Sequence, residues 1–145
     1  MFKHILIPTD GSDLSNMAIA QGVKFAREIN ARVTGITVTM PFHFFALEAT
    51  MLIDSMDLYT ADTKAMATRN LKILKDTAQA AGVECATVHS VSEHPYEAIV
   101  KTAHDEGCDV IFMASHGRRG IQALIMGGET HKVLTHTKIP VLVFR

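Results

Sequence analysis

The sequence predicts an α/β fold: a three-layer sandwich in which a five-stranded parallel sheet carries helices on both faces. Three observations predict it. Short apolar or β-branched runs alternate with longer segments whose apolar residues recur every three or four positions. Capping residues, glycines and prolines stand at the boundaries between them. Strands that alternate with helices pair in parallel, and right-handed crossovers then cover both faces of the sheet. The 145 residues fit one domain, residues 1–145, with a sizeable core.

Two predicted strands flank the first predicted helix. The apolar run Phe2–Ile7 predicts a strand, and the turn residues Pro8–Ser12 close it. Ser12 or Asp13 can cap the helix that follows. Apolar residues at helical spacing predict its buried face, which consists of Leu14, Ala18, Gly22, Phe25 and Ile29. Arg32–Thr39 alternates β-branched residues with other types and predicts the second strand.

The next segment, residues 41–56, is apolar but has no clean period. It is compatible with a core helix or with a flap over a pocket, in which Phe and Met side chains give adaptable apolar contacts. We expect a partly ordered loop and a short helix. From about Asp57 the pattern becomes helical, and Gly82 stands where a C-cap belongs. The apolar stripe of this helix is Ala67, Leu71, Leu74, Ala78 and Ala81.

The second half of the chain continues the alternation. Val83–Ser90 predicts a strand, and Pro95 suits the first position of the helix that follows. Cys108–Ala114 predicts the fourth strand, Glu129–Thr137 the last helix and Val141–Phe144 the last strand. The side chains expected to face inward from these two helices are Ile99, Ala103, Val133 and Leu134.

Composition argues against several classes of protein. A net charge of −1 implies no strongly basic surface, so we expect no nucleic-acid partner. No apolar run approaches the ~18 residues that span a bilayer, so we expect no membrane partner. Met1–His4 leads into a strand without a signal-peptide cleavage pattern. Cys85 and Cys108 lack CxxC spacing and are expected to be buried thiols in a reducing cytoplasm. None of the eight histidines shows zinc spacing with a second ligand pair, so no direct metal ligation is expected.

One stretch concentrates the candidate chemistry. Ala114–Gly128 carries four glycines and the adjacent pair Arg118 and Arg119, and it follows the buried run Val110–Met113. A strand that enters a glycine-rich turn and then a helix is a common way to hold phosphate, because backbone N–H groups and the helix dipole both favour an anion. The alternative is that these glycines only make turns.

Three loops follow strands of the predicted sheet. They are Pro8–Ser12, Thr39–His43 and Ser115–Gly120. Ligands of such sheets bind at the carboxyl ends of the strands, where the strand order reverses. We therefore expect these loops to converge on one cleft.

Two motifs resemble one known family. Ile5–Ser12 looks like the opening of the universal stress protein family, and Ser115–Gly120 with Gly127 and the ending Ile139–Val143 looks like its C-terminal half. The resemblance covers the whole chain. It implies a Rossmann-like fold of the adenine nucleotide alpha hydrolase type. It also implies a stress-response module that binds ATP, ADP or AMP, with Mg²⁺ as a potential cofactor.

The resemblance also assigns roles. Asp10 aligns with an acidic residue at the adenosine site, where it would accept from ribose or adenine or reach Mg²⁺ through water. Val38 would address the adenine edge through its main chain, and Gly117 and Gly127 would hold phosphate. His116 has no visible nucleophile or acid partner, so a structural or base-packing role is expected and no catalytic residue is assigned. The nucleotide-binding set is Pro8, Thr9, Asp10, Val38, Ala114, His116, Gly117, Arg118, Arg119, Gly120, Gly127, Gly128, Glu129 and Thr130.

The chain departs from the family's phosphate pattern, Gly-x-x-Gly, nine residues, then Gly-Ser or Gly-Thr, at two positions. Ala114 replaces the first glycine, which is a mild change. Gly128 replaces the hydroxyl residue, and a hydrogen bond to a charged group is worth about 1.5–3 kcal/mol, so phosphate binding should weaken by one to two orders of magnitude. The N–H groups of Gly127 and Gly128 are expected to remain for the phosphate. Thr130 could supply a hydroxyl only if the helix start is shifted.

Three functions remain open. The first is nucleotide binding that acts by ligand state, and the second is a nucleotide-free dimeric interaction protein, which the Gly128 departure favours. The third is a slow ATPase or a related pyrophosphatase, but no general base stands out, so efficient hydrolysis is not expected. In the family the last strand lies at the sheet edge and pairs with its twin, which implies a homodimer through Val141–Phe144. An interior strand is the alternative.

Overall fold

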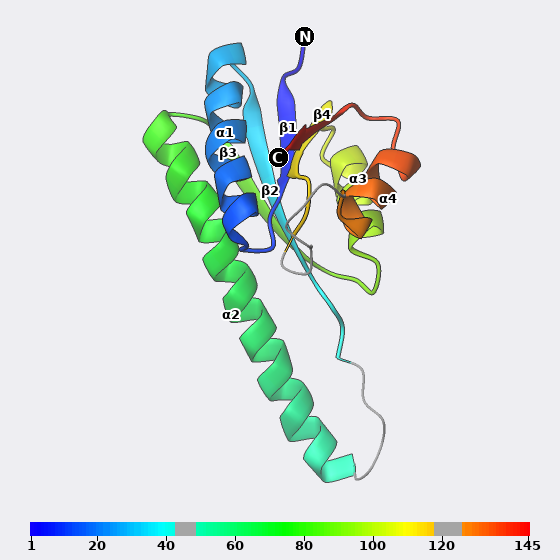
Figure 1. Cartoon of the computed structure of the whole chain (residues 1–145). Coiled ribbons are helices and arrows are strands. Elements are labelled where there is room, and N and C mark those ends of the chain that lie inside the picture. Colours follow the sequence, from blue (N-terminus) through cyan, green and yellow to red (C-terminus); the bar gives the residue numbers. More distant parts are fainter. Residues whose placement is uncertain (43–48, 118–125) are drawn as a thin grey trace.

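The computed structural model describes residues 1–42, 49–117 and 126–145. Within these ranges strands and helices alternate along the chain, as predicted (Figure 1). The strands are β1 (His4–Pro8), β2 (Arg32–Thr39), β3 (Cys85–Val91), β4 (Val110–Ala114) and β5 (Val141–Phe144). The helices are α1 (Asp13–Ile29), α2 (Ala49–Ala81), α3 (Pro95–Asp105) and α4 (Gly128–His136).

The strands form one parallel sheet in the order β3-β2-β1-β4-β5. The chain builds the sheet outward from β1 through β2 to β3, and then crosses to the other side of β1 to add β4 and β5. The strand order therefore reverses between β1 and β4, where a sheet of this kind offers a ligand crevice at its carboxyl edge. Figure 1 shows α1 and α2 on one side of the sheet and α3 and α4 on the other, which confirms the three-layer prediction.

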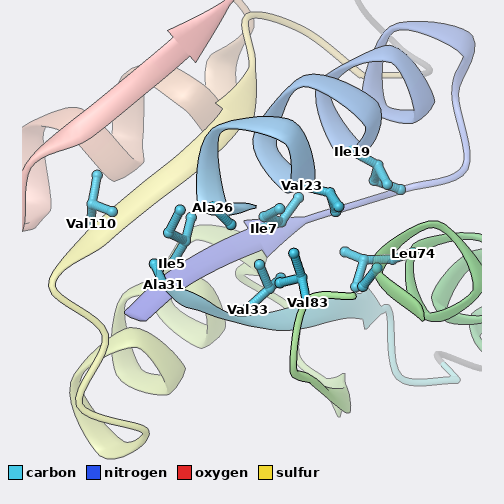
Figure 2. Close-up of a cluster of buried hydrophobic side chains, with 11 residues drawn as sticks. Ile5, Ile7, Ile19, Val23, Ala26, Ala31, Val33, Leu74, Val83 and Val110 are labelled. Atoms are coloured by element: carbon cyan, nitrogen blue, oxygen red, sulfur yellow. The ribbon is translucent and has the colours of Figure 1, made fainter. Parts of the chain in front are cut away.

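The core has two halves, one on each face of the sheet. Successive side chains of β1 point to opposite faces, so Ile5 and Ile7 pack toward α1 and α2 while Leu6 packs toward α3 and α4. Figure 2 shows the first half, in which Val23 of α1 and Leu74 of α2 meet the strand side chains. Because β1 is covered on both faces, the turn that follows it starts from a fixed position.

Predicted capping residues mark several helix ends. The Ser12 hydroxyl accepts the Ser15 N–H at 3.3 Å and caps α1. Gly82, with φ +70°, follows α2 as expected of a C-cap residue. Pro95 stands at the start of α3, where its missing N–H costs nothing. The predicted stripe residues Ala67, Leu71, Leu74 and Ala78 are buried, and Ala81 at the end of α2 is half-buried.

Two predictions about helices are wrong. α2 is one helix of 33 residues from Ala49, not a short helix and a second one from about Asp57. Its sequence contains neither Gly nor Pro, and its outer half lacks a clean apolar stripe because Asp54–Leu58 is exposed. Leu134 is 37% exposed, because it lies about 100° around α4 from the buried Val133. Residues 43–48, part of the expected loop or flap, lie outside the described residues.

The two cysteines are free thiols. Cys108 is buried, as predicted, whereas Cys85 is only half-buried because β3 is an edge strand. Among the described residues, no helix combines the length and the apolar character needed to cross a bilayer.

Candidate functional site

Asp10 and Gly117 lie in contact, although they are far apart in the sequence. β1 pairs with β4 through Ile5 with Val110, so the turns that leave these strands emerge side by side. A Cβ placed on Gly117 would overlap Oδ2 of Asp10 and lie 3.1 Å from its Cγ. Two of the three predicted loops therefore converge at the point where the strand order reverses.

Hydrogen bonds stabilise the Asp10 turn. The Ser12 N–H donates to Asp10 Oδ1 at 3.0 Å, and the Gly11 N–H donates to the Thr9 hydroxyl at 3.2 Å. Gly11 has φ +78°, a left-handed conformation that glycine adopts without strain. Because Ser12 engages one carboxylate oxygen, the other is directed against Gly117.

The buried hydroxyl groups of Thr9, Ser15 and Thr37 hold this turn in place. The Thr37 hydroxyl donates to the Thr9 carbonyl at 2.9 Å, and the Thr9 N–H donates to the Ile36 carbonyl at 2.9 Å. The Thr9 hydroxyl is also 3.0 Å from the Ser15 hydroxyl. Sequence reasoning missed Thr37 and Ser15. Their signal was present, because hydroxyl residues at the end of a strand and in the first turn of a helix are well placed to hold a loop.

The glycine-rich stretch is closed by backbone contacts. The Gly127 N–H donates to the Ser115 carbonyl at 2.7 Å, and a Cβ on Gly127 would lie 3.0 Å from Cα of His116. Two backbone segments therefore approach closely at Gly127. The expectation that its N–H remains for a phosphate is wrong, because Ser115 already accepts it. Nothing lies within 4 Å of a Cβ placed on Gly128.

Glu129 and Thr130 use their side chains within the fold. The Glu129 carboxylate accepts the Tyr96 N–H at 2.9 Å, at the start of α3, and lies 3.2 Å from Lys132 Nζ. The buried Thr130 hydroxyl donates to the Ala114 carbonyl at 2.9 Å. Thr130 therefore does not replace the hydroxyl that Gly128 lacks.

Val38 presents its main-chain polar groups to the β1 side of β2. The register of β2 with β1 ends at Pro8 with Ile36, and the Ile36 carbonyl points to β1. Backbone direction alternates along a strand, so the polar groups of Val38 also point to that side, beyond the end of β1. Its side chain packs against the core half under α3 and α4.

Other predicted residues are placed as follows. Pro8 is half-buried at the end of β1, and Ala114 is buried at the end of β4. His116 is half-buried, with Nδ1 3.2 Å from the Ser115 hydroxyl. Arg118, Arg119 and Gly120 lie outside the described residues.

The described residues contain no cluster of three or more His, Cys, Asp or Glu that could hold a metal ion. Burial raises the pKa of the Cys108 thiol to about 12, so this group stays protonated at neutral pH and is a poor nucleophile. The structure brings the Asp10 carboxylate to the carboxyl edge of β1 and β4.

Comparisons with known proteins agree on one family. The model of the universal stress protein family matches residues 1–145. Universal stress protein MJ0531 of Methanocaldococcus jannaschii is 31% identical over 145 residues, which are 100% of this chain and 83% of that protein. The solved structure of MJ0577 from the same organism has a TM-score of 0.82 at 27% identity, and the match covers 99% of this chain and 95% of that one.

Two more distant structures were solved with nucleotides. A universal stress protein in complex with cAMP has a TM-score of 0.71 at 23% identity, with 99% of this chain and 96% of that chain covered. One from Archaeoglobus fulgidus in complex with dAMP has a TM-score of 0.68 at 15% identity, with 100% and 98% covered. At these identities the likeness shows a shared fold.

Proposed function

Because this chain belongs to the universal stress protein family, we propose that it binds an adenine nucleotide (ATP, ADP or AMP) where the carboxyl ends of β1, β2 and β4 meet. The observation that carries the proposal is the contact of the Asp10 carboxylate with Gly117 at the reversal of strand order. It brings together an acceptor for hydroxyl groups and a turn that a polyanion can approach. The cAMP and dAMP complexes of distant relatives support an adenine nucleotide as the ligand.

In the proposed complex each group of the ligand has its own partner. The Asp10 carboxylate accepts from the ribose hydroxyls, as a carboxylate does strongly. The main chain of Val38 pairs with the adenine edge, and the phosphates lie between Gly117 and Gly128. Asp10 is also the residue that could hold Mg²⁺ through water. We propose that the protein acts by its ligand state, with at most slow ATP hydrolysis.

Titration calorimetry with AMP, ADP and ATP tests this function. We expect heat of binding for at least one of the three at micromolar to millimolar concentration. Thermal shift at the same concentrations gives an independent measurement, because a ligand that binds only the folded state raises its stability. No heat and no thermal shift at millimolar nucleotide would overturn the proposal and leave the nucleotide-free interaction protein as the better reading.

Gly128→Ser should tighten ATP binding. The position is open, so the hydroxyl fits and can donate to a phosphate oxygen. One hydrogen bond to a charged group is worth about 1.5–3 kcal/mol, which corresponds to roughly a tenfold or larger gain. Calorimetry with ATP measures it. Gly128→Ala adds the carbon without the hydroxyl and should give no such gain. Equal affinities for all three chains would show that the hydroxyl is not the missing group.

We also propose a homodimer through β5. This strand stands at the edge of the sheet and is apolar, with Leu142 38% exposed, and an apolar edge strand invites pairing. Leu142→Asp should convert the dimer to a monomer in sedimentation velocity, because it places a charge in the pairing strand. Leu134→Asp is the matched control, since Leu134 is equally exposed (37%) but lies on α4. A monomeric unaltered chain, or dissociation by both variants, would argue against this interface.

The proposed setting is the cytoplasm. Free thiols at Cys85 and Cys108 fit a reducing compartment.

A further inference from the structure

One buried polar side chain of α2 is not explained by the fold. Asn70 is 5% exposed, and its amide nitrogen Nδ2 is buried without a hydrogen-bond partner among the described residues. A buried donor without an acceptor destabilises a folded protein, and such groups are uncommon enough that each needs a physical reason. An apolar side chain of similar size would avoid this cost.

The position of Asn70 suggests the reason, because its amide lies against the turn that carries Asp10. A Cβ placed on Gly11 would overlap Oδ1 of Asn70 and would lie 2.9 Å from its Cγ and 3.0 Å from its Nδ2. The whole amide group is therefore in contact with Gly11. Leu74, one helical turn further along α2, packs against Gly35 in the middle of the sheet.

These contacts form a continuous series. Asn70 touches Gly11, and the neighbouring Asp10 touches Gly117. Asp10 Oδ1 is held by the Ser12 N–H, so the orientation of the carboxylate depends on the shape of the Asp10–Ser12 turn. A change in the contact between Asn70 and Gly11 would therefore change the position of the Asp10 carboxylate, the group proposed to bind the ribose.

We propose that Asn70 is a positioning residue of the nucleotide site, acting through Gly11. Its nitrogen is buried, so a ligand cannot reach it directly. The acceptor must instead come from the turn. When a nucleotide engages Asp10, the turn adjusts and one of its carbonyl oxygens accepts from Nδ2. This hydrogen bond then favours the bound conformation. This inference rests on the proposed function and adds to it a residue that does not touch the nucleotide.

The test compares two substitutions on the same face of α2. Asn70→Leu keeps the size of the side chain and removes the donor, whereas Leu74→Ala removes core packing away from the turn. Thermal unfolding and AMP titration are measured for both variants and for the unaltered chain. We expect Asn70→Leu to weaken AMP binding at least about tenfold while its melting temperature stays level or rises. Leu74→Ala should lower the melting temperature and leave AMP affinity within about twofold, since sites without shared partners act independently.

The outcomes separate the two proposals. If the unaltered chain binds AMP and Asn70→Leu binds it equally well, Asn70 only packs, and this inference is overturned while the proposed function stands. If the unaltered chain does not bind AMP, ADP or ATP, both are overturned. A weaker affinity in Leu74→Ala equal to that in Asn70→Leu would show general loosening of α2 and would also overturn the inference.

A spectroscopic measurement on the unaltered chain does not depend on how the variants fold. The side-chain NH₂ signals of Asn70 in a ¹⁵N–¹H spectrum are identified by their absence from the spectrum of Asn70→Leu. Saturation with AMP should move one of them downfield, as expected for a proton that gains a hydrogen bond. Signals that stay in place while AMP binds would contradict the proposed change of partner.

Discussion

Gly117→Val should weaken AMP binding by about 100-fold or more, the equivalent of two hydrogen bonds to a charged group. The first atom of the new side chain would occupy the place of the Asp10 carboxylate, which must then rotate away from the site. The backbone at Gly117 does not have a positive φ, so valine imposes no backbone strain there. We therefore expect a loss of binding in titration calorimetry with little change in the free energy of unfolding.

A double-mutant cycle shows whether this effect passes through Asp10. In the Asp10→Ala background the carboxylate is gone, so Gly117→Val should cost little further affinity. Residues in contact show such non-additivity, whereas independent sites add. Full additivity of the two losses would mean that valine blocks the ligand by itself and that the carboxylate contact is incidental.

Asp10→Ala should itself reduce AMP affinity by about 30- to 100-fold, because it removes the charged acceptor proposed for the ribose hydroxyls. It also removes the acceptor of the Ser12 N–H, so part of the loss comes from the turn. Asp10→Asn retains that acceptor and separates the two contributions: an affinity close to that of the alanine variant assigns the loss to the charge. Calorimetry at constant ionic strength measures all three chains.

The control for Asp10→Ala is Asp13→Ala. Asp13 is an exposed acidic residue in the first turn of α1, three positions along the chain, and it takes no part in the proposed site. Its removal changes the net charge by the same amount, so a purely long-range effect of charge would appear in both variants. Comparable losses in the two would remove the case for a specific contact at Asp10.

The sequence predicted the sheet well because buried parallel strands are the most distinctive pattern in this chain. β1 and β4 are apolar runs bounded by turn residues, and both were found within a few residues of their observed ends. The start of α2, Ala49–Met56, was predicted as part of a loop and a short helix, because the sequence of residues 41–56 has no periodic apolar pattern. Leu134 was misassigned for a related reason: in a helix of 9 residues the buried face contains too few positions to distinguish two adjacent apolar residues.

The candidate site was predicted in its location and less well in its details. Strand order brings the Asp10 turn to Gly117, and the resemblance to the family named both residues. The Gly127 N–H donates to the Ser115 carbonyl. This hydrogen bond joins two backbone groups, so the pattern of side chains in the sequence does not predict it. Asn70 was missed because a single polar residue within a helical stripe does not reveal whether its neighbour is solvent or a turn of another segment.

Because α2 is long, a small change in its direction at Asn70 would move its N-terminal end much farther. Ala67 is the first buried residue of this helix among those whose burial is described, and Figure 1 shows the N-terminal part of α2 extending away from the sheet and the other helices. The part from Ala49 to Asn70 measures about 30 Å at 1.5 Å per residue. Over that length, a tilt of about 5° at Asn70 would move the N-terminal end of α2 by nearly 3 Å. Because Asn70 lies against Gly11, a change of this turn that tilts α2 would move the far end of the helix farther than it moves Asn70.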